Sequence, residues 1–363
     1  MDSQNSSSKV TLPAHGQQAV QRTSLNNLTQ RLNICITGAG GKIAYSFLPM
    51  LCAGEVFGPE TKLDIRLLTT KNSLAKVQGI VMDLEDSMYP LVEKFHVSDD
   101  PINMFKDCDY IIALASHPRV AGMERSDLTK LNAKIFNEHA ILINEFAKPT
   151  VKVIVVTNPV NTLCRIMIKH APSIPAENFT GLTRLDANRI VVKLSQLSGA
   201  PQSSIKNVIA WGNHSRNTFA DVNHGTIDGQ PIRKVIQNDE YFEKDLQEYI
   251  ATRGFDIINL TGVTATISTA IALRDHIKDL YFGTKEGEWT SMSIASDGSY
   301  NVPKGMVFSF PVTCGKDGVK IVKNLNINGF AWNRMCLSID ELEKEADLVK
   351  EYLGDISKIR SYL

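Results

Sequence analysis

The sequence predicts an α/β fold in which the first half of the chain forms a parallel sheet. Short runs of aliphatic and β-branched residues alternate there with longer segments of helical periodicity, as strand–helix–strand units require. The first of these runs ends at a glycine-rich turn, and the alternation stops near residue 184, where long helices and mixed strands begin. We therefore expect a parallel α/β half followed by a mixed α+β half.

Four apolar runs in the first half are predicted to be buried strands, because each is short and bounded by polar or turn-forming residues. They span residues 32–38, 62–69, 109–116 and 151–159. Helical patterns lie between them near 41–54, 73–89 and 126–148. In the second half we expect helices over 186–199, 234–253, 257–281 and 338–353, with strands and turns around 289–333. The expected organisation is a tail of residues 1–31, a first domain of 32–183 and a second domain of 184–363.

The composition is that of an ordinary globular chain with no excess of charge. Of the 363 residues, 43% are hydrophobic and 21% are charged, and 39 basic residues balance 39 acidic ones. A chain without net charge or a basic stripe is not expected to bind nucleic acid or an anionic membrane surface. No apolar run approaches the ~18 residues of a membrane-spanning helix, so a membrane segment is not expected either.

The six cysteines follow neither CxxC nor metal-ligand spacing, and most lie in apolar runs. Buried, reduced thiols are therefore expected rather than a disulfide framework, and no metal site is expected. The cysteines are Cys35, Cys52, Cys108, Cys164, Cys314 and Cys336.

The first 31 residues are rich in Ser, Gln, Asn and Thr and lack the apolar core of a secretory signal. A flexible tail on a cytoplasmic protein is the preferred interpretation. An organellar transit peptide stays open as the alternative, because such peptides are also rich in serine and poor in acids. Asp2 and the shortage of arginine count against it.

A glycine turn follows the first predicted strand, at the point where a helix should begin. Glycines there permit a tight turn and bring backbone N–H groups to a pyrophosphate at the helix N-terminus. The turn alone is a weak signal, because a Gly-rich strand–helix turn can be purely structural. With its flanking strand and helix it predicts a Rossmann-type, doubly wound dinucleotide-binding domain, whose cofactor lies on Gly38, Ala39, Gly40, Gly41, Lys42, Ile43 and Ala44.

Several separated motifs follow one another along the chain, which is a far stronger signal than one glycine turn. They are TGAGGKIAYSF (37–47), HPRVAGMERSDL (117–128), VIVVTNPVNTLC (153–164), FTGLTRLDANR (179–189) and AWGNHS (210–215). From about residue 32 onward the chain resembles the cytosolic and chloroplast type of malate dehydrogenase, within the lactate/malate dehydrogenase superfamily. The resemblance implies a Rossmann domain followed by an α+β catalytic domain. It also implies reversible hydride transfer between NAD(P)H and oxaloacetate or malate.

Reduction of a 2-oxo acid needs a general acid that protonates the carbonyl oxygen while the carbon receives a hydride. The resemblance assigns this proton to His214, and it assigns to Asp186 the carboxylate that orients the imidazole and stabilises its protonated form. Arg189 lies three residues after Asp186 and so shares its helix face. A guanidinium there can hold the C1 carboxylate of the substrate through two parallel hydrogen bonds.

The resemblance gives two further arginines a role on the segment after the third predicted strand. Arg125 would close over the substrate and polarise its carbonyl. Arg119 would pair with the second carboxylate of a dicarboxylic acid, where related lactate dehydrogenases have an uncharged residue. Since an arginine facing a monocarboxylate would stay unpaired, the site should reject pyruvate.

Four residues on or near the fourth predicted strand are implied to contact substrate or cofactor. Asn158 should hydrogen-bond the substrate carbonyl. The positions expected near the nicotinamide and its ribose are Asn132, Val156 and Thr157.

The end of the second predicted strand departs from the NAD-dependent pattern of the family. An aspartate usually binds the adenine ribose hydroxyls there, whereas this chain has Thr69, Thr70 and Lys71. Hydroxyls and a lysine suit a 2′-phosphate, so use of NADP as well as NAD is the preferred interpretation. Simple drift in an NAD-dependent enzyme stays open.

Two other functions stay open at this point. A reductase of another 2-oxo acid is the rival among enzymes, and a non-catalytic dinucleotide-binding protein is the rival outside them. The second is less favoured because His214, Asp186 and all three arginines are present. The resemblance also implies a homodimer.

Overall fold

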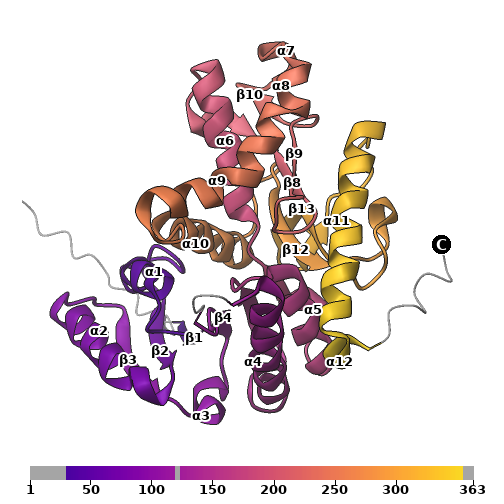
Figure 1. The fold of residues 1–363 in the computed structure, drawn as a ribbon. Helices are drawn as coiled ribbons and strands as arrows, with labels where there is room; N and C mark the ends of the chain where they lie inside the picture. Colours follow the sequence, from indigo (N-terminus) through magenta and orange to yellow (C-terminus); the bar gives the residue numbers. More distant parts are fainter. Residues whose placement is uncertain (1–29, 119–122, 355–363) are drawn as a thin grey trace, which may run out of the picture.

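A nine-stranded sheet runs through the described residues, which are 30–118 and 123–354 of this computed structural model (Figure 1). Six of its strands are parallel neighbours in the order β3-β2-β1-β4-β5-β6. In this doubly wound order the chain builds one side of the sheet from β1 and then returns to build the other, which confirms the predicted fold class. The six strands are β1 (Arg31–Thr37), β2 (Lys62–Leu68), β3 (Val92–Ser98), β4 (Tyr110–Ala113), β5 (Lys152–Val155) and β6 (Phe179–Gly181).

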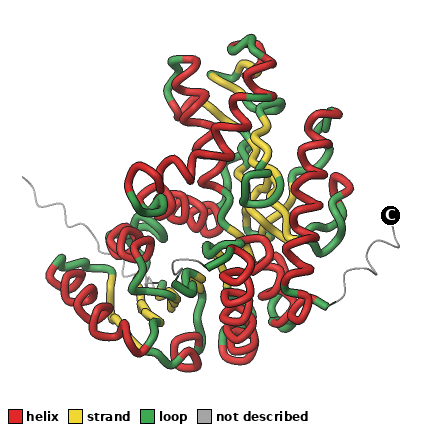
Figure 2. Tube along the Cα trace, in the orientation of Figure 1, coloured by secondary structure: helices red, strands yellow, loops and turns green. Residues whose placement is uncertain are grey.

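Helices bury both faces of the parallel strands, and Figure 2 shows the strands inside and the helices outside. In β1, Ile34 and Ile36 face one helical layer and Cys35 faces the other, as the two-residue repeat of a strand requires. Because both faces are apolar, such strands read as continuous hydrophobic runs, which is why the sequence reveals them. The first layer is α1 (Lys42–Cys52), α2 (Leu74–Asp86) and α10 (Ile267–Phe282), and the second is α3 (Pro101–Phe105), α4 (Arg125–Phe146) and α5 (Val160–His170).

Two of the parallel strands were not among the four that the sequence predicts. β3 lies at the edge of the sheet, where Glu93 and Lys94 are exposed, so its sequence VEKFHVS lacks an apolar run. β6 is only three residues long. Neither strand has a local pattern that distinguishes it from a loop, and neighbouring strands supply the pairing that makes each one a strand.

The second half of the chain extends the same sheet. Strands β12 (Thr290–Ala295), β13 (Val307–Gly315) and β14 (Gly318–Ile321) are antiparallel, and β12 joins β6 through the pairing of Gly181 with Ser293. The predicted region of strands around 289–333 is therefore confirmed. The expected boundary between residues 183 and 184 falls directly before α6 (Arg184–Ser198), while the sheet continues across it. The exact extent of the two domains stays a prediction.

Two long helices expected in the second half are broken. The predicted helix 234–253 is divided among α7 (Ile232–Val235), α8 (Asp239–Glu243) and α9 (Asp245–Thr261), because the side chain of Asn238 caps a new helix by accepting from the N–H of Tyr241. The predicted helix 257–281 is interrupted at Gly262, which ends α9 with a φ of +71°. The last predicted helix begins earlier than expected, since Asn328 caps α11 (Gly329–Leu348), which α12 (Lys350–Leu353) follows.

Two small sheets complete the second half. Their strands are β7 (Ile205–Lys206), β8 (Ile209–Trp211), β9 (Phe219–Asp221), β10 (Thr226–Ile227) and β11 (Gln230–Pro231). Across the described residues, no helix is both long and apolar enough to cross a lipid bilayer.

Two histidines, His276 fully buried and His139 partly buried, should make the stability depend on pH. Burial lowers the pKa of His276 to about 3 and the pKa of His139 to about 4. His276 has no exposed surface, and its Nε2 shares a hydrogen bond of 2.8 Å with the hydroxyl of Thr180. Below about pH 6.5 these histidines bind a proton in the unfolded chain but not in the folded protein. Their contribution to the free energy of unfolding is therefore complete above that pH and is lost as the pH falls.

We predict that the free energy of unfolding falls by about 1.4 kcal/mol per pH unit for each buried histidine as the pH drops from about 6 to about 4.5. His276→Gln, which keeps a hydrogen-bonding side chain but does not titrate, should flatten this slope by about the contribution of one histidine. Denaturant unfolding at several pH values measures the effect, with His224→Gln at a less buried site as the matched control. An unchanged slope in His276→Gln would contradict the assignment.

Candidate active site

The candidate site lies at the carboxyl edge of the parallel strands, between β1 and β4. The chain winds in opposite directions from these two neighbours, and ligands of doubly wound sheets bind in the crevice at such a point. The buried hydroxyl of Thr37, the last residue of β1, accepts hydrogen bonds of 3.1 Å and 2.9 Å from the N–H groups of Leu114 and Ala115 after β4. These bonds hold the ends of the two strands together.

The glycine turn between β1 and α1 has a geometry that other residues would not reproduce. Gly38 has a φ of +64°, and a Cβ on it would lie 2.7 Å from the carbonyl oxygen of Leu114. Gly41 precedes α1 with no side-chain cap, so the N–H groups of Lys42, Ile43 and Ala44 have no carbonyl partner within the helix. Such an uncapped N-terminus fits the pyrophosphate of a dinucleotide. Within the turn, two N–H groups are already used: Ala39 donates to the carbonyl of Leu68 at 3.2 Å, and Gly41 donates to the carbonyl of Gly38 at 2.9 Å.

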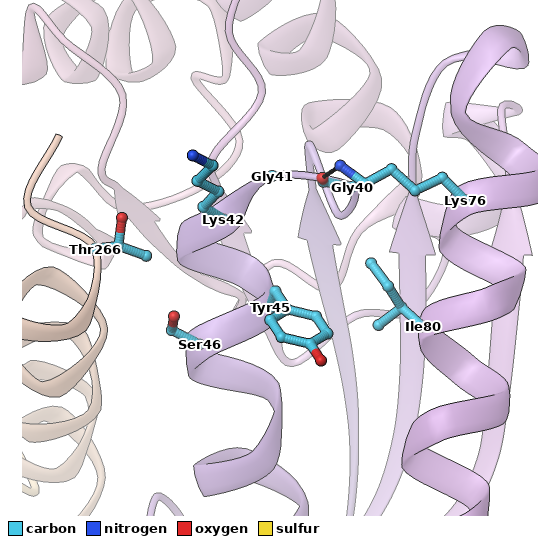
Figure 3. Close-up of a pocket in the computed structure, with 8 residues that line it drawn as sticks. All are labelled: Gly40, Gly41, Lys42, Tyr45, Ser46, Lys76, Ile80 and Thr266. Atoms are coloured by element: carbon cyan, nitrogen blue, oxygen red, sulfur yellow. Dashed lines mark hydrogen bonds between the residues drawn. The ribbon is translucent and has the colours of Figure 1, made fainter. Parts of the chain in front are cut away.

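A cleft of about 440 Å³ opens beside this turn, between α1 and α2 (Figure 3). Lys42 and Lys76 stand on either side of the glycines, and the ammonium group of Lys76 donates a hydrogen bond of 2.7 Å to the carbonyl of Gly40. Two positive charges next to the turn favour an anionic ligand. Lys76 was not among the predicted residues, because an exposed lysine in an amphipathic helix carries no signal of its own. The cleft is lined by Gly40, Gly41, Lys42, Tyr45, Ser46, Lys76, Ile80 and Thr266.

No carboxylate belongs to the segment of residues 69–73 that follows β2. Thr69 donates its N–H to the carbonyl of Ser98, and the hydroxyls of Thr70 and Ser73 lie 3.3 Å apart. Lys71 is exposed in a turn of 3₁₀ helix. The segment therefore presents hydroxyls and an ammonium group next to the glycine turn.

The ends of β4, β5 and α4 are joined by two predicted residues. Asn132 of α4 is buried, accepts from the N–H of His117 at 2.8 Å and donates to the carbonyl of Asn158 at 3.0 Å. Thr157 donates its hydroxyl to the carbonyl of Ala115 at 3.0 Å. The side chain of Asn158 is exposed at this edge, directly before a cis peptide bond, whereas Val156 is buried. Asn158 is therefore available to a ligand.

The predicted proton donor and its carboxylate are in direct contact. Nδ1 of His214 lies 2.5 Å from Oδ2 of Asp186, and Asp186 is only 2% exposed. An ionised carboxylate only accepts hydrogen bonds, so this contact leaves the proton on Nδ1 and turns Nε2 toward the site as the exchanging nitrogen. Nε2 has no hydrogen-bond partner within the described residues. The pair has the arrangement of a general acid–base group with an orienting carboxylate.

Arg189 lies beside this pair, with Nη1 3.4 Å from Oδ1 of Asp186. The two residues are one helical turn apart on α6, as the sequence indicates. The guanidinium is largely buried and still has further N–H groups to offer a carboxylate. Arg119 lies outside the described residues. For Arg125 the structure gives the backbone, as the first residue of α4.

Helix α11 holds the residues on both sides of His214. Asn213 donates to Glu341 at 3.0 Å and to Glu345 at 3.2 Å, and the hydroxyl of Ser215 donates to Glu341. The sequence predicts a helix over 338–353 and does not single out either glutamate. The spacing of its two glutamates, four residues apart on one face, is the signal that they act together.

The described residues contain no group of three or more His, Cys, Asp and Glu side chains that could hold a metal ion. Five of the six cysteines are buried and all six are free thiols, as the sequence predicts.

Comparison with known proteins identifies the family of both halves of the chain. The model of the lactate/malate dehydrogenase NAD-binding domain matches residues 32–180, and that of the lactate/malate dehydrogenase α/β C-terminal domain matches residues 183–353. The cytoplasmic malate dehydrogenase of Gallus gallus is 40% identical over 328 residues, which cover 89% of this chain and 98% of that protein.

Solved structures include relatives from both branches of the family. Malate dehydrogenase from Naegleria fowleri has 34% identity and a TM-score of 0.85, with 89% of this chain and 98% of that chain covered. Trichomonas vaginalis lactate dehydrogenase in complex with NADH and oxamate has 31% identity and a TM-score of 0.84, with 90% and 99% covered. By its two domains and these relatives, the chain belongs to the lactate/malate dehydrogenase family of NAD-binding oxidoreductases.

Proposed function

We propose that this protein is a malate dehydrogenase, which interconverts malate and oxaloacetate by hydride transfer with a nicotinamide dinucleotide. The observation that carries the proposal is the contact of His214 with the buried Asp186, beside Arg189 and at the edge of the sheet where the glycine turn lies. A proton donor, a carboxylate-binding guanidinium and a dinucleotide cradle are the groups that reduction of a 2-oxo acid requires.

When bound, the dinucleotide supplies the hydride to the substrate carbonyl carbon or takes it back. The protein's own part is the proton. Nε2 of His214 donates it to the carbonyl oxygen during reduction and accepts it from the hydroxyl during oxidation. Asp186 stabilises the positive imidazolium and keeps the ring in the tautomer that exposes Nε2. In this cycle His214 exchanges the proton, and Asp186 keeps the ring in place.

Substrate binding is assigned to the polar groups around His214. Arg189 would hold the C1 carboxylate, and Asn158 would bind the carbonyl oxygen from the end of β5. Arg125 would polarise the carbonyl as negative charge develops on its oxygen. Arg119 would pair with the second carboxylate and so select a dicarboxylic acid.

The rival enzyme is a reductase of another 2-oxo acid. Relatives of both substrate types are similar to this chain, so overall similarity does not choose between them. The chain's own arginine at position 119 favours a dicarboxylate. A non-catalytic dinucleotide-binding role is not supported, because a protein without catalysis would have no reason to keep a carboxylate 98% buried against an imidazole.

The cofactor is a nicotinamide dinucleotide, since the first domain matches the NAD-binding domain of the family. We infer in addition that NADPH is accepted. Thr69, Thr70 and Lys71 offer no carboxylate that would repel a 2′-phosphate, and Lys71 and Lys76 add positive charge.

We further infer a cytoplasmic homodimer. The cytoplasmic relative from Gallus gallus supports the location. Large apolar side chains are exposed on the helices of one face of the sheet, with Tyr45 on α1, Met82 on α2 and Ile267 on α10 exposed by 52%, 65% and 72%. Apolar side chains gathered on one side of a protein favour association with a second copy.

We expect His214→Asn and Asp186→Asn each to lower kcat for oxaloacetate by at least ~10², because a positioned acid–base group contributes about 10²–10⁴. Dissociation constants for NADH, measured by fluorescence titration, should change little. Near-wild-type turnover by His214→Asn would rule out this histidine as the proton donor.

Arg119→Gln should sharply reduce kcat/KM for oxaloacetate, so that pyruvate becomes a relatively better substrate. The substitution removes the partner of the second carboxylate and also removes a charge that pyruvate leaves unpaired. Steady-state assays with both substrates measure the ratio of the two kcat/KM values. If the ratio did not move, Arg119 would be a solvated surface charge.

For the cofactor, kcat/KM with NADPH should lie within about tenfold of that with NADH, which corresponds to a net preference of about 1.4 kcal/mol. Thr69→Asp should restore a clear preference for NADH, because a carboxylate binds the ribose hydroxyls and repels the phosphate. Lys71→Ala should selectively weaken the binding of NADPH. A wild-type preference for NADH above about a hundredfold would show that some other residue rejects the phosphate.

A further inference from the structure

Asn161 is a buried polar residue at the start of α5 that no part of the mechanism above uses. It has no exposed surface, and it follows Thr157 and Asn158 by only a few residues. Its neighbours Val160 and Leu163 are apolar and equally buried. A carboxamide in this place must bind other polar groups, since burying one without partners is costly.

The carboxamide binds the backbone of His214 and of Gly212, two residues before it. Its Oδ1 accepts from the N–H of His214 at 3.1 Å, and its Nδ2 donates to the carbonyl of Gly212 at 3.1 Å. The second Nδ2 proton is donated to the carbonyl of Val307 in β13, also at 3.1 Å. Both N–H donors of the side chain are therefore used, and the residues flanking the imidazole are held to one rigid group.

This arrangement gives the imidazole two anchors in different halves of the protein. Asp186 of α6 fixes the ring at Nδ1, and Asn161 of α5 fixes the backbone from which the ring projects. Asn161 comes three residues after Asn158, the residue exposed at the candidate site. The distance from His214 to a substrate on that edge therefore depends on the Asn161 contacts.

We propose that Asn161 is a positioning residue for the reaction, which sets the place of the His214 imidazole relative to the substrate and cofactor. The inference rests on the proposed role of His214. Asn161 does not touch the reacting atoms in this role, and it acts through the main chain of residues 212–214. A displacement of about 1 Å at a reacting group can cost on the order of a hundredfold in rate.

The test compares Asn161→Leu, which keeps the size of the side chain but removes all three hydrogen bonds, with Thr180→Val as a matched control. Thr180 is also buried, and its hydroxyl binds His276 and not residues 212–214. The readouts are the single-turnover rate of NADH oxidation at saturating oxaloacetate, the dissociation constant for NADH, and the Tm.

Asn161→Leu should lower the single-turnover rate about 10–100-fold while NADH affinity stays within about twofold. Thr180→Val should lower Tm and leave the rate unchanged. A rate for Asn161→Leu within about twofold of wild type, or an equal loss in Thr180→Val, would overturn the proposal and leave Asn161 with a structural role.

Asn161→Asp decides the question if the leucine variant does not fold. When protonated, the new carboxyl group has one donor and one acceptor and can bind Gly212 and His214 as the carboxamide does. When ionised, it would repel the carbonyls of Gly212 and Val307. Facing those oxygens, it should hold its proton to a higher pH than an exposed aspartate.

The ratio of the Asn161→Asp rate to the wild-type rate should therefore rise as the pH falls from about 8 to about 6, and a ratio independent of pH would overturn the proposal. His214→Asn separates this outcome from failure of the proposed function. If His214→Asn is inactive while the Asn161 variants are not impaired, only the positioning role fails.

Discussion

The two central parallel strands, β1 and β4, end so close together that no side chain fits at Gly38. A Cβ on Gly38 would lie 2.7 Å from the carbonyl of Leu114, and the Thr37 hydroxyl accepts from the N–H groups of Leu114 and Ala115, directly after β4. This contact fixes where α1 begins, and hence where its free N–H groups point. It also fixes the end of β4, against which Thr157 sets the end of β5. The positions of the glycine turn and of the exposed Asn158 thus both follow from the close contact between Gly38 and Leu114.

The second half reaches this edge because it shares the sheet. β12 pairs with β6. Gly212, two residues before His214, forms an isolated antiparallel bridge with Ser309 of β13. His214 is therefore registered to the same hydrogen-bonded framework as the glycine turn. The buried carboxylate of Asp186 is tolerated because His214 and Arg189 both contact it. Removing one partner from such a buried pair typically costs about 3–5 kcal/mol, so the pair is kept as a unit.

The features that could be predicted from the sequence are those that depend on interactions between residues close together in the chain. Strands buried on both faces read as apolar runs, and Asp186 and Arg189 share a helix face by their spacing alone. The pairing of His214 with Asp186 came from resemblance to a family, because 28 residues separate them in the chain. β6 and the contact of Asn161 with residues 212–214 had no local pattern. Each depends on segments that only the folded sheet brings together, as the single pairing of Gly181 with Ser293 illustrates.

The backbone framework of the fold and the residues proposed to select the substrate lie in different parts of the chain. A malate dehydrogenase and a lactate dehydrogenase match the chain equally well, with TM-scores of 0.85 and 0.84, so the backbone framework is common to both branches. In the proposed mechanism His214 performs a step that reduction of any 2-oxo acid needs, and its backbone is held by a hydrogen bond to Asn161. Arg119 follows β4 and precedes α4 in the sequence, and it lies outside the described residues. In the proposed function, a charge at this position selects the acid through the far end of the substrate, while the groups that transfer the proton stay the same.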